Sequence, residues 1–159
     1  MNDPDDERTH VLIRVHAAER AVEIGDGRAF AVVRMGRAGT VIDVTDEDFT
    51  AEVIRSELPV LVEFTADWCP PCRMMAPVLA ELAEERADEL HIVALDVDTN
   101  PGVQSRYGVL SMPTMMLFRG GEPVWSAVGA RAKRRLGQEL SEALQHGAVS
   151  PVSRGGAPA

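Results

Sequence analysis

Two cysteines, Cys69 and Cys72, are the residues of this sequence best suited to chemistry, and they lie in the segment Trp68-Cys69-Pro70-Pro71-Cys72. A disulfide exchanger needs one exposed and ionised thiol, because only the thiolate attacks. It also needs a second thiol close enough to resolve the mixed disulfide. The chain has only these 2 cysteines, so a framework of several disulfides is excluded. The pair predicts redox chemistry.

The thiol pair is expected at a strand-to-helix junction. The continuous apolar run over 60–64, with Glu63 inside it, is typical of a central strand covered on both faces. A helix is expected to begin at Pro70. At its N-terminus, unsatisfied N–H groups and the helix dipole favour a negative sulfur on Cys69. Because Pro70 and the proline after it lack N–H groups, the N–H of Cys72 is the natural donor to that sulfur.

A zinc site is the main alternative use for two thiols at this spacing. It would need further ligands, and the histidines show no pairing in the sequence. They are His10, His16, His91 and His146. The sequence also lacks a Gly-rich turn between strand and helix that would cradle a phosphate. We therefore expect no metal and no bound cofactor.

The elements that must position the thiols alternate along the chain. We expect strands over 40–44, 60–64, 91–97, 114–118 and 122–128, and helices over about 45–57, 70–87 and 101–107. A final helix follows from the apolar stripe of Leu136, Leu140, Ala143 and Leu144. Thr45 is expected to cap the first helix, with Asp46 in its first turn, and Asn100 to cap the third. The order β-α-β-α-β-α-β-β-α predicts an α/β fold with a central mixed β-sheet and helices on both faces.

Composition narrows the class of protein. The 159 residues are 45% hydrophobic and 26% charged, as in a globular domain with a sizeable core. Lys and Arg number 16 against 25 Asp and Glu, a net charge of -9, which disfavours binding to nucleic acid or anionic membranes. No apolar run reaches the roughly 18–20 residues that cross a bilayer. Because the chain opens with acidic residues where a signal peptide is basic, we expect a cytoplasmic protein.

Two segments flank the regular pattern. Residues 1–39 form an N-terminal extension with β-like runs at 11–15 and 30–34, separated by glycines. This extension is expected to be a small β-hairpin or partly disordered, or to result from a start codon assigned too far upstream. Residues 147–159 are rich in Gly, Ser, Pro and Ala, which is typical of a flexible C-terminal tail.

Residues 40–146 resemble the thioredoxin family. The resemblance rests on the segment 60–77, which holds the central strand, the WCPPC motif and Pro77, and on Asp98-Thr99-Asn100-Pro101, Tyr107-Gly108-Val109, Met112-Pro113-Thr114, 118–122 and Val128-Gly129. It implies the thioredoxin fold and protein-disulfide reductase activity that maintains cytosolic protein thiols. It also implies client proteins that carry disulfides, a flavin- and NADPH-dependent thioredoxin reductase as partner, and a monomeric state.

The resemblance also implies a docking surface. Pro113 would be a cis-proline facing the disulfide, and the backbone of Met112 would pair with an extended client segment. Trp68, Met112, Pro113 and Gly129 would form the apolar rim. Alternatively, Pro113 merely ends a loop before a strand. For Trp125 we favour packing over contact with clients.

Glu63 is expected to act with the thiols. A carboxyl within a buried strand should have a raised pKa. The family has an Asp here, thought to relay the proton of the resolving cysteine, which is Cys72 in this chain. The family's nearby Lys is Ala94 here, which should raise the pKa of Glu63 further. The alternative is a Glu that points outward at a strand end.

Pro70 is a second departure, because the usual family motif has Gly there. A CPPC motif also occurs in exported relatives that reduce cytochrome maturation proteins, but the interval between Cys69 and Pro113 leaves no room for their insertion. An oxidase or isomerase that makes disulfides is one rival function, and a scaffold that binds partners without thiol chemistry is another. We expect the reductase, in which Cys69 attacks and Cys72 resolves.

Overall fold

The computed structural model describes residues 39–146 and the backbone of residues 22–23 and 30–31. The chain divides into two compact units, Met1–Gly36 and Arg37–Ala159. In the first unit, β1 (Val22–Glu23) pairs antiparallel with β2 (Phe30–Ala31). The strand expected over 11–15 lies outside the described residues, and β2 is the described part of the strand expected over 30–34.

The second unit is built on a five-stranded sheet in the order β3-β5-β4-β6-β7. Its strands are β3 (Ile42–Asp43), β4 (Val60–Thr65), β5 (His91–Asp96), β6 (Thr114–Arg119) and β7 (Glu122–Val128). Strands β3 and β4 run parallel to β5, whereas β6 runs antiparallel to both β4 and β7. The sheet is therefore mixed, as the sequence predicts.

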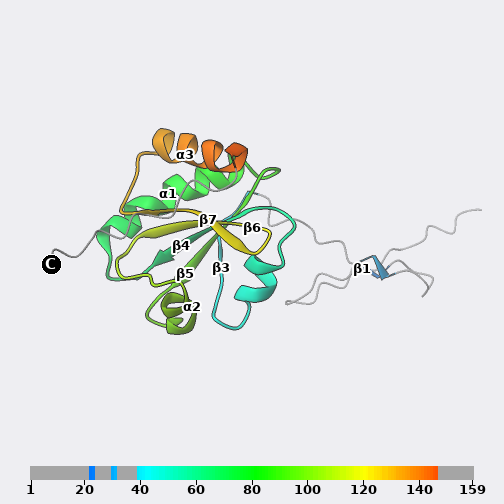
Figure 1. The fold of residues 1–159 in the computed structure, drawn as a ribbon, viewed down its shortest axis with the longest axis horizontal. Helices are drawn as coiled ribbons and strands as arrows, with labels where there is room; N and C mark the ends of the chain where they lie inside the picture. Colours follow the sequence, from blue (N-terminus) through cyan, green and yellow to red (C-terminus); the bar gives the residue numbers. More distant parts are fainter. Residues whose placement is uncertain (1–21, 24–29, 32–38, 147–159) are drawn as a thin grey trace, which may run out of the picture. The chain divides into compact units, whose positions relative to one another are not determined.

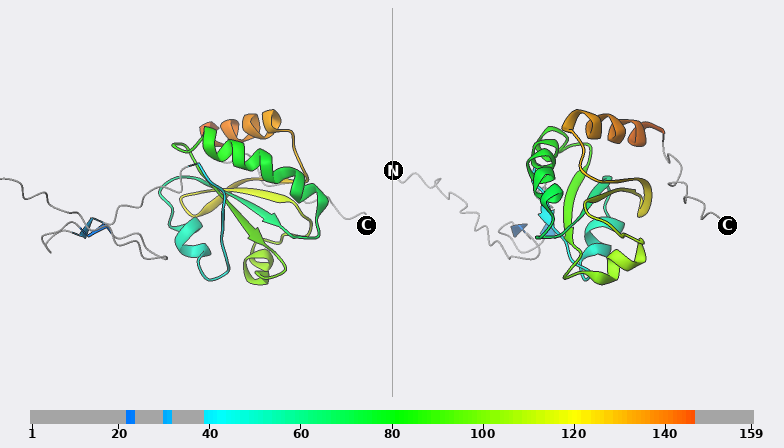
Figure 2. Two further views of the ribbon diagram at one scale, coloured as in Figure 1. Left: turned by 180° about the vertical axis from the view of Figure 1, so that it is seen from behind. Right: turned by 90° about the vertical axis from the view of Figure 1, so that its left-hand side faces the viewer.

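Helices cover both faces of this sheet (Figure 1). They are η1 (Thr50–Ile54), α1 (Pro70–Glu85), α2 (Pro101–Arg106) and α3 (Lys133–His146). Helices α1 and α3 lie together on one face, and α2 and η1 on the other, in both views of Figure 2. This arrangement is the thioredoxin fold that the resemblance implies. Within the described part of the chain, no helix is long and apolar enough to cross a membrane.

Strand β4 separates two apolar cores, because successive side chains point to opposite faces of a sheet. Val62 is fully buried in one core, together with Phe49, which directly precedes η1, and Val103 of α2. Leu61 is fully buried in the other core, with Leu79 of α1 and Leu136 of α3. Burying each such side chain contributes about 1.5–3 kcal/mol. These two cores fix β4, and with it the start of α1, in the centre of the molecule.

The first helix is shorter than the expected span of 45–57. Helical bonding does begin at Thr45, whose carbonyl accepts from the N–H of Phe49. The regular part is the π-helical turn η1, in which the N–H of Arg55 donates to the carbonyl of Thr50. The hydroxyl of Thr45 does not cap the helix; it donates to Asp48. The backbone N–H of Thr45 donates to the same Oδ1 of Asp48, so this short-range contact stands where the cap was expected.

Asp46 caps a different helix from the one expected. Its two carboxylate oxygens accept from the N–H groups of Gly102 and Val103, each at 2.8 Å, at the N-terminus of α2. Asn100 occupies the cap position of α2, but its side chain makes no capping bond there. Its Oδ1 instead accepts from the N–H of Asp46 at 2.9 Å. The sequence assigns Asp46 and Asn100 to the caps of two separate helices. In the structure these two residues instead bond to each other and join the segment before η1 to α2.

Candidate active site

Cys69 and Cys72 are joined in a disulfide at the N-terminus of α1, with their Cα atoms 5.3 Å apart. Cys69 is the N-cap residue, and its side chain takes the place of the usual capping oxygen. The N–H of Cys72 donates to the Cys69 sulfur at 3.3 Å. This is the hydrogen bond that the two prolines predict, since neither Pro70 nor Pro71 has an N–H to offer.

The surroundings of the disulfide are more closed than expected. Cys69 exposes 3% and Cys72 2% of its surface, whereas an exposed attacking thiol was predicted. In a disulfide each sulfur covers the other, and both cysteines belong to the apolar cluster that includes Ala66 and against which Met112 packs. The neighbouring Trp68 is the exposed side chain here, at 60%.

Glu63 lies on β4 and is buried, with 4% of its surface exposed. It does not point outward at a strand end. Burial raises its pKa from 4.5 to about 7, because the charged form loses its hydration. Among the described residues, none donates a hydrogen bond to its Oε1. The carboxyl therefore keeps its proton to a higher pH than an exposed glutamate does.

A recess of about 330 Å³ is lined by both this carboxyl and Cys72. Glu63, Cys72 and Ala94 all line it, together with residues that include the exposed Asp43 and Arg73. Ala94 faces Glu63 across the β4–β5 pair. Its methyl group leaves the recess open and supplies no positive charge, so burial alone sets the pKa of Glu63.

Trp68 is held by a partner that the sequence did not reveal. Its indole Nε1 donates to Oδ2 of Asp98 at 2.8 Å. Trp68 follows β4 and Asp98 follows β5, and the carboxyl ends of adjacent parallel strands meet at one edge of a sheet. That shared edge is the signal by which Asp98 could have been found.

The loop before β6 meets the end of β7. The peptide bond between Met112 and Pro113 is cis, and the carbonyl of Pro113 accepts from the N–H of Gly129 at 2.8 Å. Thr114, the next residue, pairs with Phe64 near the end of β4. The structure thus brings Met112, Pro113 and Gly129 together at the edge from which the Cys69 loop departs.

Trp125 does not join this edge. It pairs with Leu117 across β6 and β7 and packs against the core beneath α1 and α3. This agrees with the favoured interpretation of Trp125 as a packing residue. Among the described residues, no group of three or more His, Cys, Asp and Glu side chains could hold a metal ion.

Comparisons with known proteins agree with this geometry. The Thioredoxin family model matches residues 40–142. Thioredoxin of Mycobacterium tuberculosis is 50% identical over 103 residues, which cover 65% of this chain and 89% of that protein. Thioredoxin of Mycolicibacterium smegmatis is 46% identical over 112 residues, covering 69% of this chain and 100% of that protein.

A longer relative is the bifunctional thioredoxin reductase/thioredoxin of Mycobacterium leprae, which is 50% identical over 107 residues. The match covers 67% of this chain but only 23% of that protein. The family match, the mixed sheet and the disulfide at the N-terminus of α1 lead to one conclusion. The chain belongs to the thioredoxin family.

Proposed function

We propose that this protein reduces disulfide bonds of client proteins by dithiol–disulfide exchange through Cys69 and Cys72. The observation that carries the proposal is the disulfide at the N-terminus of α1, with the N–H of Cys72 directed at the Cys69 sulfur. In the reduced protein the same N–H and the helix dipole favour a thiolate on Cys69.

The reaction has two exchanges. The Cys69 thiolate attacks one sulfur of the client disulfide, whose S–S bond breaks, and the other client sulfur leaves as a thiolate. Cys72 then loses its proton and attacks the Cys69 sulfur in the mixed disulfide. This forms the Cys69–Cys72 bond and releases the second client thiol. Two electrons pass from the cysteine pair to the client, and the oxidised pair corresponds to the state described above.

Glu63 is the proposed acceptor of the Cys72 proton. Support comes from the recess that both residues line and from the pKa of about 7, which suits a base that works near neutral pH. The absence of a cation at Ala94 leaves Glu63 to act without an ion-pair partner from that position.

Trp68, Met112, Pro113 and Gly129 are the proposed docking residues for clients. The exposure of Trp68 and the contact of Gly129 with Pro113 support this assignment. An extended client segment would pair with the backbone of Met112, as in other recognition by strand addition.

Recycling of the oxidised pair needs an electron donor, for which we propose a thioredoxin reductase that uses a flavin and NADPH. The M. leprae relative, a bifunctional thioredoxin reductase/thioredoxin, supports such a pairing. A reducing compartment, the cytoplasm, suits this cycle. In this role the protein would carry electrons for cell redox homeostasis as a monomer, with no part for nucleic acid or membrane.

Insulin reduction with dithiothreitol tests the proposal. Wild type should accelerate precipitation of the insulin B chain, and Cys69→Ser should leave only the uncatalysed rate. Equal rates for the two proteins would refute the reductase function. The reduction potential of the pair separates a reductase from a disulfide-forming oxidase, because the oxidase requires a potential near the ~-120 mV of strong oxidants rather than the ~-270 mV of reductants.

A further inference from the structure

Gly129, which directly follows β7, is one of the proposed docking residues for clients. The N–H of Gly129 bonds to the carbonyl of Pro113, and Val128 pairs with Thr114. Gly129 has a φ of 88°, which an L side chain rarely adopts. A turn of this kind needs contacts that hold it in one conformation, because β7 ends at Val128 and no regular element follows until α3 begins at Lys133.

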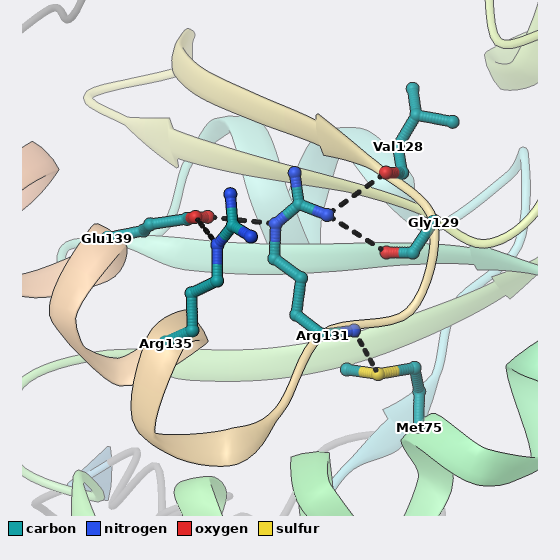
Figure 3. A network of polar contacts seen from close by, with 6 residues as sticks. All are labelled: Met75, Val128, Gly129, Arg131, Arg135 and Glu139. Atoms are coloured by element: carbon teal, nitrogen blue, oxygen red, sulfur yellow. Dashed lines mark hydrogen bonds and ion pairs between the residues drawn. The ribbon is translucent and has the colours of Figure 1, made fainter.

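Arg131 supplies those contacts by folding back on the turn (Figure 3). Its Nη1 donates to the carbonyl of Val128 at 3.0 Å and to that of Gly129 at 3.4 Å. Its backbone N–H donates to Sδ of Met75 at 3.3 Å. Met75 lies on α1, one turn beyond Cys72, so Arg131 joins the turn to the helix that carries the disulfide.

Glu139 on α3 anchors the other side of the guanidinium. The distance from Arg131 Nε to Glu139 Oε2 is 3.0 Å, and the side chains are 19% and 22% exposed. Burial opposes ionisation of Glu139, but hydrogen bonds from Arg135 and Arg131 outweigh it and hold its pKa below the usual value. The anchor therefore stays charged at neutral pH.

Arg135 shares this anchor without touching the turn. It donates to Glu139 Oε1 at 2.8 Å, and its side chain is 70% exposed. Figure 3 shows the two arginines side by side on one carboxylate, with only Arg131 reaching the carbonyls. The chain thus offers a matched pair, in which each arginine bonds to Glu139 and one alone holds the turn.

We propose that Arg131 is a positioning residue for client docking: anchored by Glu139, it holds Val128 and Gly129 against Pro113 so that the docking surface is formed before a client arrives. A preformed loop need not be ordered when the client binds, which lowers the free-energy cost of association. The inference rests on the proposed reductase function. It assigns Arg131 no part in the thiol chemistry.

The test uses wild type, Arg131→Ala and Arg135→Ala in two assays. The first is steady-state reduction of insulin with dithiothreitol as electron donor, and the second is single-turnover reduction of the small disulfide 5,5′-dithiobis(2-nitrobenzoate) by each protein, reduced beforehand and freed of reductant. We expect Arg131→Ala to raise KM for insulin at least about threefold, with kcat nearly unchanged, since loop ordering becomes a cost of binding. Its rate with the small disulfide, which needs no docking surface, should equal that of wild type. Arg135→Ala should match wild type with both substrates.

An unchanged KM in Arg131→Ala, or an equal rise in Arg135→Ala, would overturn the inference. So would a parallel loss with the small disulfide, which would indicate general damage. If Arg131→Ala does not fold, Glu139→Gln removes the charge of the anchor while leaving Arg131 in place, and it should raise KM for insulin but not alter the small-disulfide rate. A wild type that fails to reduce insulin would refute the proposed function itself.

Discussion

Glu63 and Ala94 are direct partners across the β4–β5 pair, a buried carboxyl beside a methyl group. Ala94 carries no charge that could offset the burial of Glu63. Burial is accordingly the cause of the raised pKa, about 7. One strand further, Asp43 pairs with Ala94 and is exposed at the sheet edge. The row from Asp43 to Glu63 has no positive side chain, so no charge from these paired residues opposes the effect of burial on the pKa of Glu63.

The free energy of unfolding of the oxidised protein should fall as the pH rises through the pKa of Glu63. The folded-state pKa of about 7 exceeds the ordinary value of 4.5, so the folded protein binds the proton more tightly than the unfolded chain. The stabilisation that comes from this tighter proton binding is fully present below pH 4.5 and is lost as pH rises through about 7. The loss should approach roughly 3 kcal/mol, at 1.36 kcal/mol per pKa unit.

Urea unfolding of wild type and Glu63→Gln at pH 5 and pH 8.5 checks this. Glu63→Gln should lose most of the difference between the two pH values, because Gln does not titrate. Glu47→Gln, at an exposed position, is the control and should behave as wild type. The same pH dependence in wild type and Glu63→Gln would show that the carboxyl titrates normally.

A lysine at position 94 should lower the pKa of Glu63. The ammonium would enter the recess that both residues line, and an opposite charge within reach favours the ionised carboxyl, by about 1 unit or more. Carbon-13 NMR of the glutamate side-chain carboxyls in Ala94→Lys gives the pKa directly. Ala51→Lys, on η1, should leave it unchanged. An unaltered pKa in Ala94→Lys would mean that the lysine turns to solvent.

The hydrogen bonds that Asp46 accepts from the N-terminus of α2 should contribute to stability. Asp46→Ala removes two charge-assisted caps from α2, which should cost about 1–2 kcal/mol. A Cβ on Gly102 would lie 2.7 Å from Oδ2 of Asp46, so Gly102→Ala must displace the carboxylate and should cost a similar amount. Urea unfolding measures both, with Glu47→Ala as the control.

The double variant of Asp46 and Gly102 makes this test sharper. With Asp46 already replaced by Ala, the new methyl group meets no carboxylate, and Gly102→Ala should cost little or stabilise α2. Additive losses in the double-mutant cycle would show that the two residues do not act through each other.

Asp98 should restrain the exposed Trp68 ring. Because their hydrogen bond ties the indole to the sheet edge, Asp98→Ala should lower the fluorescence anisotropy of Trp68, measured in a Trp125→Phe background. Asp67→Ala, next to Trp68 and exposed, is the matched control. Unchanged anisotropy in Asp98→Ala would mean that other contacts hold the ring.

Local patterns predicted the parts of this site that depend on neighbours in sequence. The apolar run of β4, the helix beginning at Pro70 and the Cys72 N–H to the Cys69 sulfur all follow from short-range geometry. The burial of Glu63 also follows from its place inside that apolar run, although the recess that it shares with Cys72 depends on the packing of α1 over β4.

Contacts between distant segments could not be predicted in the same way. The sequence assigned Asp46 to the helix that begins beside it, because an acid is stabilising near any helix N-terminus. The sequence does not show that packing brings a second N-terminus, that of α2, within reach of the same carboxylate. Arg131 lies in a stretch with no motif, and its role depends on the approach of α3 to the end of β7. A side chain that bonds to another helix or strand need not follow the spacing of apolar residues in its own element. Its partner can therefore be named only once the order of the strands in the sheet is known.

The most direct test of thiol exchange is to trap the intermediate. Reduced Cys72→Ser, mixed with insulin, should accumulate a mixed disulfide through Cys69, because the resolving thiol is gone; peptide mass spectrometry under non-reducing conditions identifies the linkage. Cys69→Ser should form markedly less adduct, since the Cys72 sulfur lies inside the helix behind the cap position. No adduct through Cys69, or equal trapping by the two variants, would contradict the assignment of Cys69 as the attacking thiol.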